Sequence, residues 1–202
     1  MSDADLPVTG VVLAGGRSRR FGRDKLAEPY GDGVLLHRPV LALREVCDEV
    51  VVVLAPDAPE PAMPPGVDVA IARDAEADAG PLVGMVAGLT AVREGGAIVA
   101  GGDMPELQPP VLLEMLRAGR ETGAVAVALS DAGDARPLPI VLRVGPALVA
   151  AERLLATDRR RLRDLLAEVH TVVIDEPTWT ALDPDRRTLL DVDEESDLEQ
   201  RR

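Results

Sequence analysis

Five short apolar runs constrain the fold of this chain more than any other feature of its sequence. They are rich in Val, Ile, Ala and Leu and do not alternate between apolar and polar residues. They span residues 8–15, 48–55, 67–72, 96–102 and 123–130. Strands buried on both faces have this character, whereas strands with one face in water alternate. The runs therefore predict a parallel sheet that is covered on both sides.

Amphipathic segments lie between these runs. Residues 34–47, 81–94 and 109–121 carry apolar residues at helical spacing, and Pro81 and Pro109 fall in the first turn, where a helix tolerates proline. Strands that alternate with helices are typical of a doubly wound α/β fold. We predict a three-layer, mostly parallel, Rossmann-like α/β sheet that binds its ligands at the carboxyl ends of the strands.

The second half of the chain is less regular. We predict strands at 136–143, 170–175 and 187–193, helices at 146–156 and 160–169, and a final acidic helix from residue 194. Two prolines interrupt the first of these strands, which favours an edge position because proline cannot donate to a sheet ladder. The proline-rich stretch 55–66 is expected to be a surface loop, since strands continue on both sides of it. We predict one domain over residues 1–202.

Composition excludes several classes of function. The net charge is −13 and the chain has three aromatic residues, so we expect no nucleic-acid partner. No apolar run reaches membrane-spanning length and no signal peptide is visible, so we expect a cytoplasmic protein with no membrane contact. The single cysteine, Cys47, excludes an internal disulfide and a cysteine cluster for zinc, and we expect it to be a small core residue.

The stretch LAGGRSRRFGRDK (13–25) departs from this acidic background. A strand that ends in Gly15-Gly16 lets the backbone approach a ligand closely and present its amides to phosphate oxygens. Of the 22 Lys and Arg residues in the chain only Lys25 is a lysine, and it closes a run of five basic residues. Neither the Gly-Lys-Ser/Thr phosphate loop nor the dinucleotide fingerprint is present. The basic density predicts an anionic ligand.

This stretch resembles the signature of nucleotidyltransferases that share a glycosyltransferase-A-like, nucleotide-diphospho-sugar transferase type of fold. It is most similar to the molybdenum cofactor guanylyltransferases, whose loop reads LAGG-x-S-x-R-x-G-x-DK. Four later landmarks follow in the family's order. They are AGPLVGM (79–85), GGDMP (101–105), RPLPIVL (136–142) and LLDVDEESDLE (189–199). The resemblance therefore covers nearly the whole chain.

The resemblance implies a role for several residues. It assigns Lys25 to the triphosphate, where a compact ammonium can follow charge that moves in the transition state, with help from Arg20. It assigns nucleotide contacts to the loop and to residues near the guanosine and the start of a helix. These contacts come from Leu13, Ala14, Gly15, Gly16, Lys25, Asp74, Gly80 and Asp103.

A magnesium site is the second implication. Asp103 directly follows a buried strand, where a carboxylate is well placed for a ligand, and Mg²⁺ takes one or two carboxylates plus substrate phosphates. The family has its metal-binding Asp here. Asp191 and Asp193 depart from the family, which favours Asn at both positions. They are expected either to add a second metal contact or to cap the final helix.

The implied reaction is Mg²⁺-dependent transfer of GMP from GTP to the terminal phosphate of molybdenum-bound molybdopterin, with pyrophosphate as the leaving group and molybdoenzyme maturation proteins as partners. Leu54 stands where the family commonly has an Asn that helps to bind the nucleotide, so CTP is an alternative donor. A sugar phosphate is an alternative acceptor. A nucleotide-binding module without catalysis is the alternative of another class. The basic cluster 158–166 is either a solvated face or a contact for the acceptor phosphate.

Overall fold

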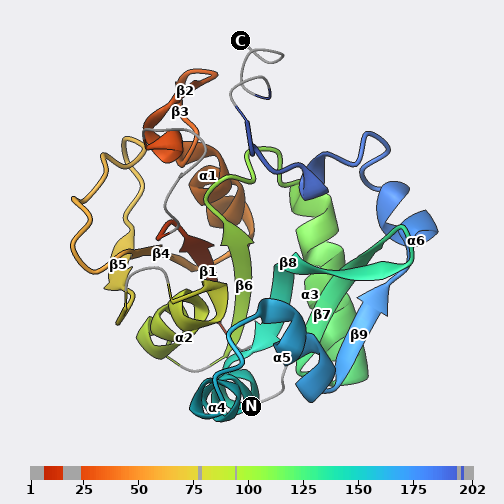
Figure 1. The fold of residues 1–202 in the computed structure, drawn as a ribbon. Coiled ribbons are helices and arrows are strands. Elements are labelled where there is room, and N and C mark those ends of the chain that lie inside the picture. The colour runs from red at the N-terminus through yellow and green to blue at the C-terminus, as the bar shows by residue number, and fades with distance from the viewer. Residues whose placement is uncertain (1–6, 16–23, 77–78, 94, 195–196, 198–202) are drawn as a thin grey trace.

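The computed structural model describes residues 7–15, 24–76, 79–93, 95–194 and 197. A seven-stranded sheet with the order β5-β4-β1-β6-β8-β7-β9 forms its centre (Figure 1). The strands are β1 (Val8–Leu13), β4 (Glu49–Leu54), β5 (Ala70–Arg73), β6 (Gly96–Gly101), β7 (Ala126–Asp131), β8 (Asp134–Arg143) and β9 (Thr171–Ile174). Two short strands, β2 (Pro29–Tyr30) and β3 (Gly33–Val34), pair separately.

The sheet is mostly parallel, as the sequence predicts. The strands β5, β4, β1 and β6 are parallel neighbours, and β7 is parallel to β9. Of the seven strands only β8 runs in the opposite direction, antiparallel to both β6 and β7. The run at 123–130 therefore forms the expected buried strand, but it has one antiparallel neighbour.

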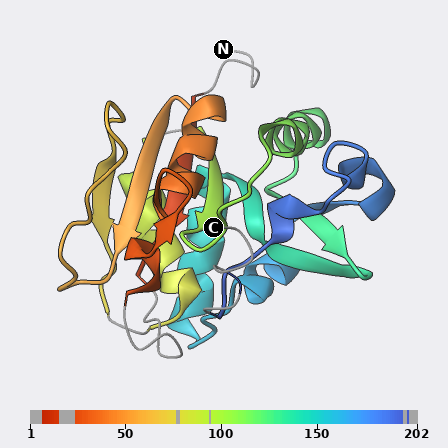
Figure 2. The ribbon, with the colours of Figure 1, turned by 90° about the horizontal axis from the view of Figure 1, so that it is seen from above.

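Helices cover both faces of the sheet and produce the predicted three layers. The helices are α1 (His37–Val46), α2 (Pro81–Ala91), α3 (Pro109–Thr122), α4 (Val144–Ala156), α5 (Leu162–Glu168) and α6 (Glu176–Thr180). In Figure 2, α1 and α3 lie above the sheet, and α2 and α4 lie below it. Successive strand residues point to opposite faces. Val12 packs in the core on the α1 and α3 side, and Val11 packs in the core on the α2 and α4 side.

The prediction that residues 136–143 form an edge strand is wrong. β8 lies between β6 and β7 in the sheet. Its pairing with β6 begins only at Ile140, and its register with β7 shifts between Val127 and Leu129. Pro137 and Pro139 lie within this irregular stretch, so an interior strand accommodates two prolines because the ladder is interrupted where they occur.

The predicted strand at 187–193 is also wrong. The segment begins with a short 3-10 helix, η3 (Arg187–Leu189), and residues 190–193 pair with no strand in the described part of the chain. Other groups bind its backbone: Thr188 N donates to Asp183 Oδ2 at 2.7 Å, and Val192 N donates to Asp103 O at 2.9 Å. These two hydrogen bonds take the place of the strand pairing that the prediction required. The predicted final helix lies almost entirely outside the described residues.

Two single-residue features complete the core. Cys47 is buried, as predicted, and burial raises the pKa of its thiol to about 12. Trp179 is fully buried in the short helix α6 and donates from Nε1 to Ser130 O at 2.9 Å. None of the helices in the described ranges combines the length and the apolar character that a bilayer span requires.

Gly88 allows α2 to pack closely on the sheet, and its replacement tests this contact. A Cβ atom at Gly88 would lie 2.5 Å from Val11 Cγ1 and 2.9 Å from Val53 Cγ2. Both valines are buried, so we expect Gly88→Ala to lower the free energy of unfolding by about 1–3 kcal/mol through overpacking. Urea unfolding measures the change.

Gly145 in α4 is the matched control, because a Cβ atom there meets nothing within 4 Å. We expect Gly145→Ala to change the free energy of unfolding by less than about 1 kcal/mol. Equal losses for both variants would contradict the close approach of α2 to β1 and β4.

Candidate functional site

A cavity of about 460 Å³ opens at the carboxyl edge of the sheet. Its lining comes from the ends of β1, β4 and β6, the start of α2, and β8. The lining residues are Leu13, Gly15, Val53, Asp74, Ala79, Gly80, Pro81, Gly84, Gly101, Asp103 and Leu138. This is the edge at which a doubly wound sheet binds its ligands, so the cavity is the candidate substrate site.

Five of the predicted nucleotide-binding residues line this cavity. They are Leu13, Gly15, Asp74, Gly80 and Asp103. Ala14 is not among the lining residues; it packs against the core on the α1 and α3 side, and its amide donates to Val53 O at 2.8 Å. Gly16 and Arg20 lie outside the described residues.

Lys25 lies beside the cavity, in contact with one of its carboxylates. It begins the 3-10 helix η2 (Lys25–Ala27), which Asp24 caps by accepting a hydrogen bond from Leu26 N at 3.1 Å. Lys25 Nζ donates to Asp103 Oδ2 at 2.7 Å and to Val192 O at 2.8 Å, and Asp193 Oδ1 lies 4.0 Å away. The Lys25 side chain is only 15% exposed, so water screens these contacts weakly.

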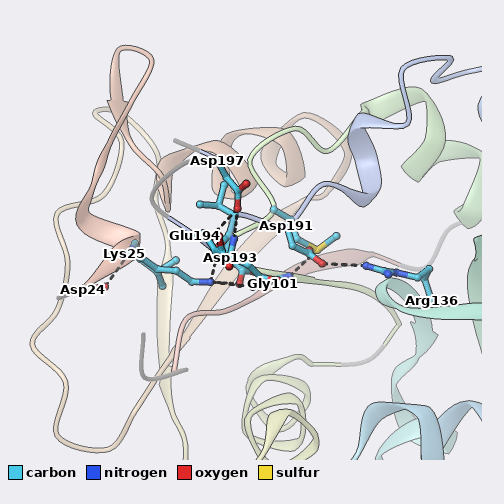
Figure 3. A network of polar contacts seen from close by, with 12 residues as sticks. Asp24, Lys25, Gly101, Arg136, Asp191, Asp193, Glu194 and Asp197 are labelled. Atoms are coloured by element: carbon cyan, nitrogen blue, oxygen red, sulfur yellow. Dashed lines mark hydrogen bonds and ion pairs between the residues drawn. The ribbon is translucent and has the colours of Figure 1, made fainter. Parts of the chain in front are cut away.

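Asp103 joins the sheet to residues 191–193, the closing segment of the site. It follows β6 by two residues, and Gly102 N donates to Leu13 O at 2.9 Å, so the chain stays next to β1 beyond the end of the ladder. The carbonyl of Asp103 accepts from Val192 N, which brings residues 191–193 alongside. The contacts of Lys25 and Asp103 therefore bring together the predicted site residues Lys25, Asp103, Asp191 and Asp193. Figure 3 shows Lys25, Asp191 and Asp193 in this arrangement.

Asp191 is the most perturbed carboxyl of this group. Its pKa is raised to about 6, mainly by burial and then by the nearby charges of Asp103 and Asp193, and the charges of Arg136 and Lys25 oppose this rise. Arg136 Nη2 lies 3.1 Å from Asp191 Oδ2. The sequence predicts no role for Arg136; its position in RPLPIVL (136–142) was the available signal.

The chemistry of these donors fits a divalent cation. In the described ranges no three carboxylate, imidazole or thiol groups are close enough together to form a complete metal cage. Mg²⁺ does not need one, because it binds through one or two carboxylates together with substrate phosphates and water. Asp103 and Asp191 could supply those two carboxylates, since the charge of Asp103 acts on the carboxyl of Asp191. Asp193 is 67% exposed, and its Oδ1 lies 4.0 Å from Lys25 Nζ.

The opposite end of the cavity contains Asp74 and Gly80. Burial raises the pKa of Asp74, and its amide donates to Leu54 O at 2.8 Å. Gly80 has a φ of 98°, which favours glycine, and a Cβ there would meet Arg160 O at 3.2 Å. Leu54 packs in the core on the α1 and α3 side, whereas its neighbour Val53 lines the cavity.

Two of the four arginines in the basic cluster 158–166 form ion pairs within the protein. Arg160 forms ion pairs with Asp158 at 2.7 Å and with Glu76 at 3.1 Å. Arg159 lies 3.2 Å from Glu168. These pairs favour the solvated-face interpretation for both arginines.

Known proteins are similar to this chain in sequence and in fold. A family model described as the MobA-like NTP transferase domain matches residues 10–172. The chain belongs to the MobA-like NTP transferase family. It is 34% identical, over 95% of its own length and 91% of the relative's, to a Chloroflexus aggregans protein named probable molybdenum cofactor guanylyltransferase. A Mycobacterium avium protein of the same name is 35% identical over 98% and 96% of the two chains.

Solved structures confirm the fold of this NTP transferase. The crystal structure of molybdopterin-guanine dinucleotide biosynthesis protein A from Archaeoglobus fulgidus superposes with a TM-score of 0.77, at 20% identity and over 95% of each chain. The predicted family and fold class are therefore confirmed. The NTP transferase domain match ends at residue 172, so Asp191 and Asp193 lie beyond it, although the relatives align over nearly the full chain.

The raised pKa of Asp191 predicts a pH-dependent stability. Folding raises this pKa from 3.8 to about 6, so the folded state binds the proton more tightly. The resulting stabilisation is complete below about pH 3.8 and is lost as the pH rises through about 6. Asp191→Asn removes this titration. Relative to that variant, we expect the wild-type free energy of unfolding to fall by about 1 kcal/mol between about pH 4 and 7.5, after allowance for solvent screening of a partly exposed group.

Urea unfolding of both proteins at about pH 4, 5.5 and 7.5 measures this difference. Glu114→Gln on the outer face of α3 is the control, since Arg117 holds the pKa of that carboxyl low and its stability profile should change in the opposite direction. Parallel pH profiles for the wild type and Asp191→Asn would contradict the raised pKa of Asp191.

Proposed function

We propose that this chain acts as a single nucleotidyltransferase domain that transfers GMP from GTP to the terminal phosphate of molybdenum-bound molybdopterin, with Mg²⁺ as its metal. The names of the two relatives support the choice of reaction. One observation supports it most. The only lysine of the chain is fixed between a carboxylate and a carbonyl beside a cavity at the carboxyl edge of the sheet.

Asp74 follows β5 and Asp103 follows β6, and β4 and β1 separate these two strands in the sheet, so the two carboxylates line the cavity from different ends. Asp74 and the backbone around Gly80 line one end, where a carboxylate can accept hydrogen bonds from the N–H groups of guanine. Lys25 and Asp103 lie at the other end. A nucleoside bound near Asp74 would place its phosphates toward Lys25.

The transfer step needs little acid–base chemistry. An oxygen of the acceptor phosphate bonds to the α-phosphorus of GTP, and the bond from that phosphorus to the bridging oxygen of the β-phosphate breaks. Pyrophosphate leaves with the electron pair. A phosphate oxygen is already ionised at neutral pH, so no side chain has to remove a proton. Catalysis therefore rests on positioning and on neutralisation of negative charge.

Lys25 supplies that neutralisation from the protein. Its ammonium group has three donors on a flexible stem, so it can exchange Asp103 for phosphate oxygens as charge shifts to the leaving group. Asp103, with Asp191 as its neighbour, would hold Mg²⁺, which when bound offsets the charge of the phosphates. The carbonyl of Val192 keeps Lys25 in place during the exchange.

Pyrophosphate release tests the proposed reaction. The protein is mixed with Mg²⁺ and molybdate-loaded molybdopterin, and GTP, CTP and ATP are compared. We expect release with GTP. Release with CTP alone would show that the chain is a cytidylyltransferase. No release with any nucleotide would contradict transfer to this acceptor.

Lys25→Ala tests the role of the lysine. We expect kcat to fall by about 100-fold or more, while the dissociation constant of GTP rises only a few-fold, because the ammonium acts mainly on charge that develops in the transition state. Arg117→Ala, which removes an exposed cation from α3, should change neither quantity. Equal losses in kcat and affinity would instead show a ground-state contact with phosphate.

A further inference from the structure

A line of side chains with alternating charges connects Asp191 in the site to Glu176 on α6. Glu176 Oε2 lies 2.8 Å from Arg186 Nη1, and Arg186 also pairs with Asp131. Asp131 Oδ2 lies 3.6 Å from Arg136 Nη1, and Arg136 Nη2 lies 3.1 Å from Asp191 Oδ2. The line thus begins on α6, crosses β7 and β8, and ends at the carboxylate beside Asp103.

Arg136 is the member that faces the site, and its guanidinium is fixed from two sides. One nitrogen faces Asp131 and another faces Asp191, while Nε is buried and has no hydrogen-bond partner among the described residues. A buried donor without a hydrogen-bond partner costs free energy. The ion pairs with Asp131 and Asp191 therefore determine where the Arg136 side chain lies, even though they leave Nε without a partner. Asp131 is itself held by Arg186.

The charge balance of the site shows what Arg136 does there. Asp103, Asp191 and Asp193 bring three negative charges to the place where a triphosphate is expected. Lys25 lies 2.7 Å from Asp103 and 4.0 Å from Asp193, so it compensates those two. Asp191 pairs with Arg136, which approaches from the opposite side to Lys25 (Figure 3). Without Arg136 the Asp191 carboxylate would repel an incoming phosphate.

We propose that Arg136 is a positioning residue that orients Asp191 and compensates its charge, so that a nucleoside triphosphate can enter the site. This inference rests on the proposed function, because it needs a nucleotide in the cavity. Arg136 acts through Asp191 and not by direct contact with phosphate. Movement of its guanidinium toward the ligand would break the pairs with both Asp131 and Asp191.

A double-mutant cycle tests this role. The proteins are wild type, Arg136→Gln, Asp191→Asn and the double variant. The readout is the dissociation constant of a fluorescent GTP analogue with EDTA present, so no metal takes part. We expect Arg136→Gln to weaken binding about tenfold, because contacting charges couple strongly. In the double variant we expect affinity within about twofold of Asp191→Asn, since the charge that Arg136 compensates is gone.

Several outcomes would overturn the proposal. If Arg136→Gln weakens binding equally in both backgrounds, Arg136 contacts the nucleotide directly. If it has no effect in either, the pair does not influence nucleotide entry. If the wild type binds no nucleotide at all, the proposed function fails too. If the wild type binds GTP but the cycle shows no coupling between Arg136 and Asp191, only the role of Arg136 is overturned.

Two further variants separate positioning from folding. Arg117→Gln also removes an arginine that bridges two carboxylates, Glu114 and Glu121, and it should leave nucleotide affinity unchanged. Arg136→Lys keeps the charge, so it should recover most of the affinity even if Arg136→Gln folds poorly. At saturating substrate we expect Arg136→Gln to keep kcat within about threefold of wild type. A loss confined to kcat would contradict a role in nucleotide entry.

Discussion

The contact of the Lys25 ammonium with Asp103 and with the carbonyl of Val192 is the interaction on which the rest of the site depends. It joins three segments that are far apart in sequence: the segment after β1, the end of β6 and the closing segment. The amide of Val192 returns a hydrogen bond to the carbonyl of Asp103. Because β1 and β6 are parallel neighbours, their carboxyl ends emerge side by side, and Lys25 contacts Asp103 at this edge of the sheet.

The contact also explains why an arginine-rich chain uses a lysine at this position. The Lys25 side chain is 15% exposed and donates to a carboxylate and to a backbone carbonyl that lie on different segments. A compact ammonium can donate in both directions, whereas the planar fork of a guanidinium suits two parallel acceptors. Arginine occurs instead at Arg136, which links the acidic partners Asp131 and Asp191.

Sequence alone predicts the parts of this fold that depend on local patterns. Buried apolar runs specify β1, β4 and β6, and a polar residue just after such a run identifies Asp103. The interior position of β8 could not be predicted in this way, because it depends on a register shift that accommodates Pro137 and Pro139. The role of Arg136 was hidden for a similar reason, since its partners Asp131 and Asp191 come from other segments.

Formation of the dinucleotide product by Asp103→Asn across a range of Mg²⁺ concentrations measures how far the reaction depends on the Asp103 carboxylate. Asp185→Asn, which alters an exposed carboxylate that pairs with Arg187, is the control. If Asp103 and Lys25 together handle the charge of the reaction, Asp103→Asn should form product about 100-fold more slowly at every Mg²⁺ concentration while it still binds GTP. Product formation at the wild-type rate, with an unchanged Mg²⁺ dependence, would contradict the assignment of Asp103 and the account built on it.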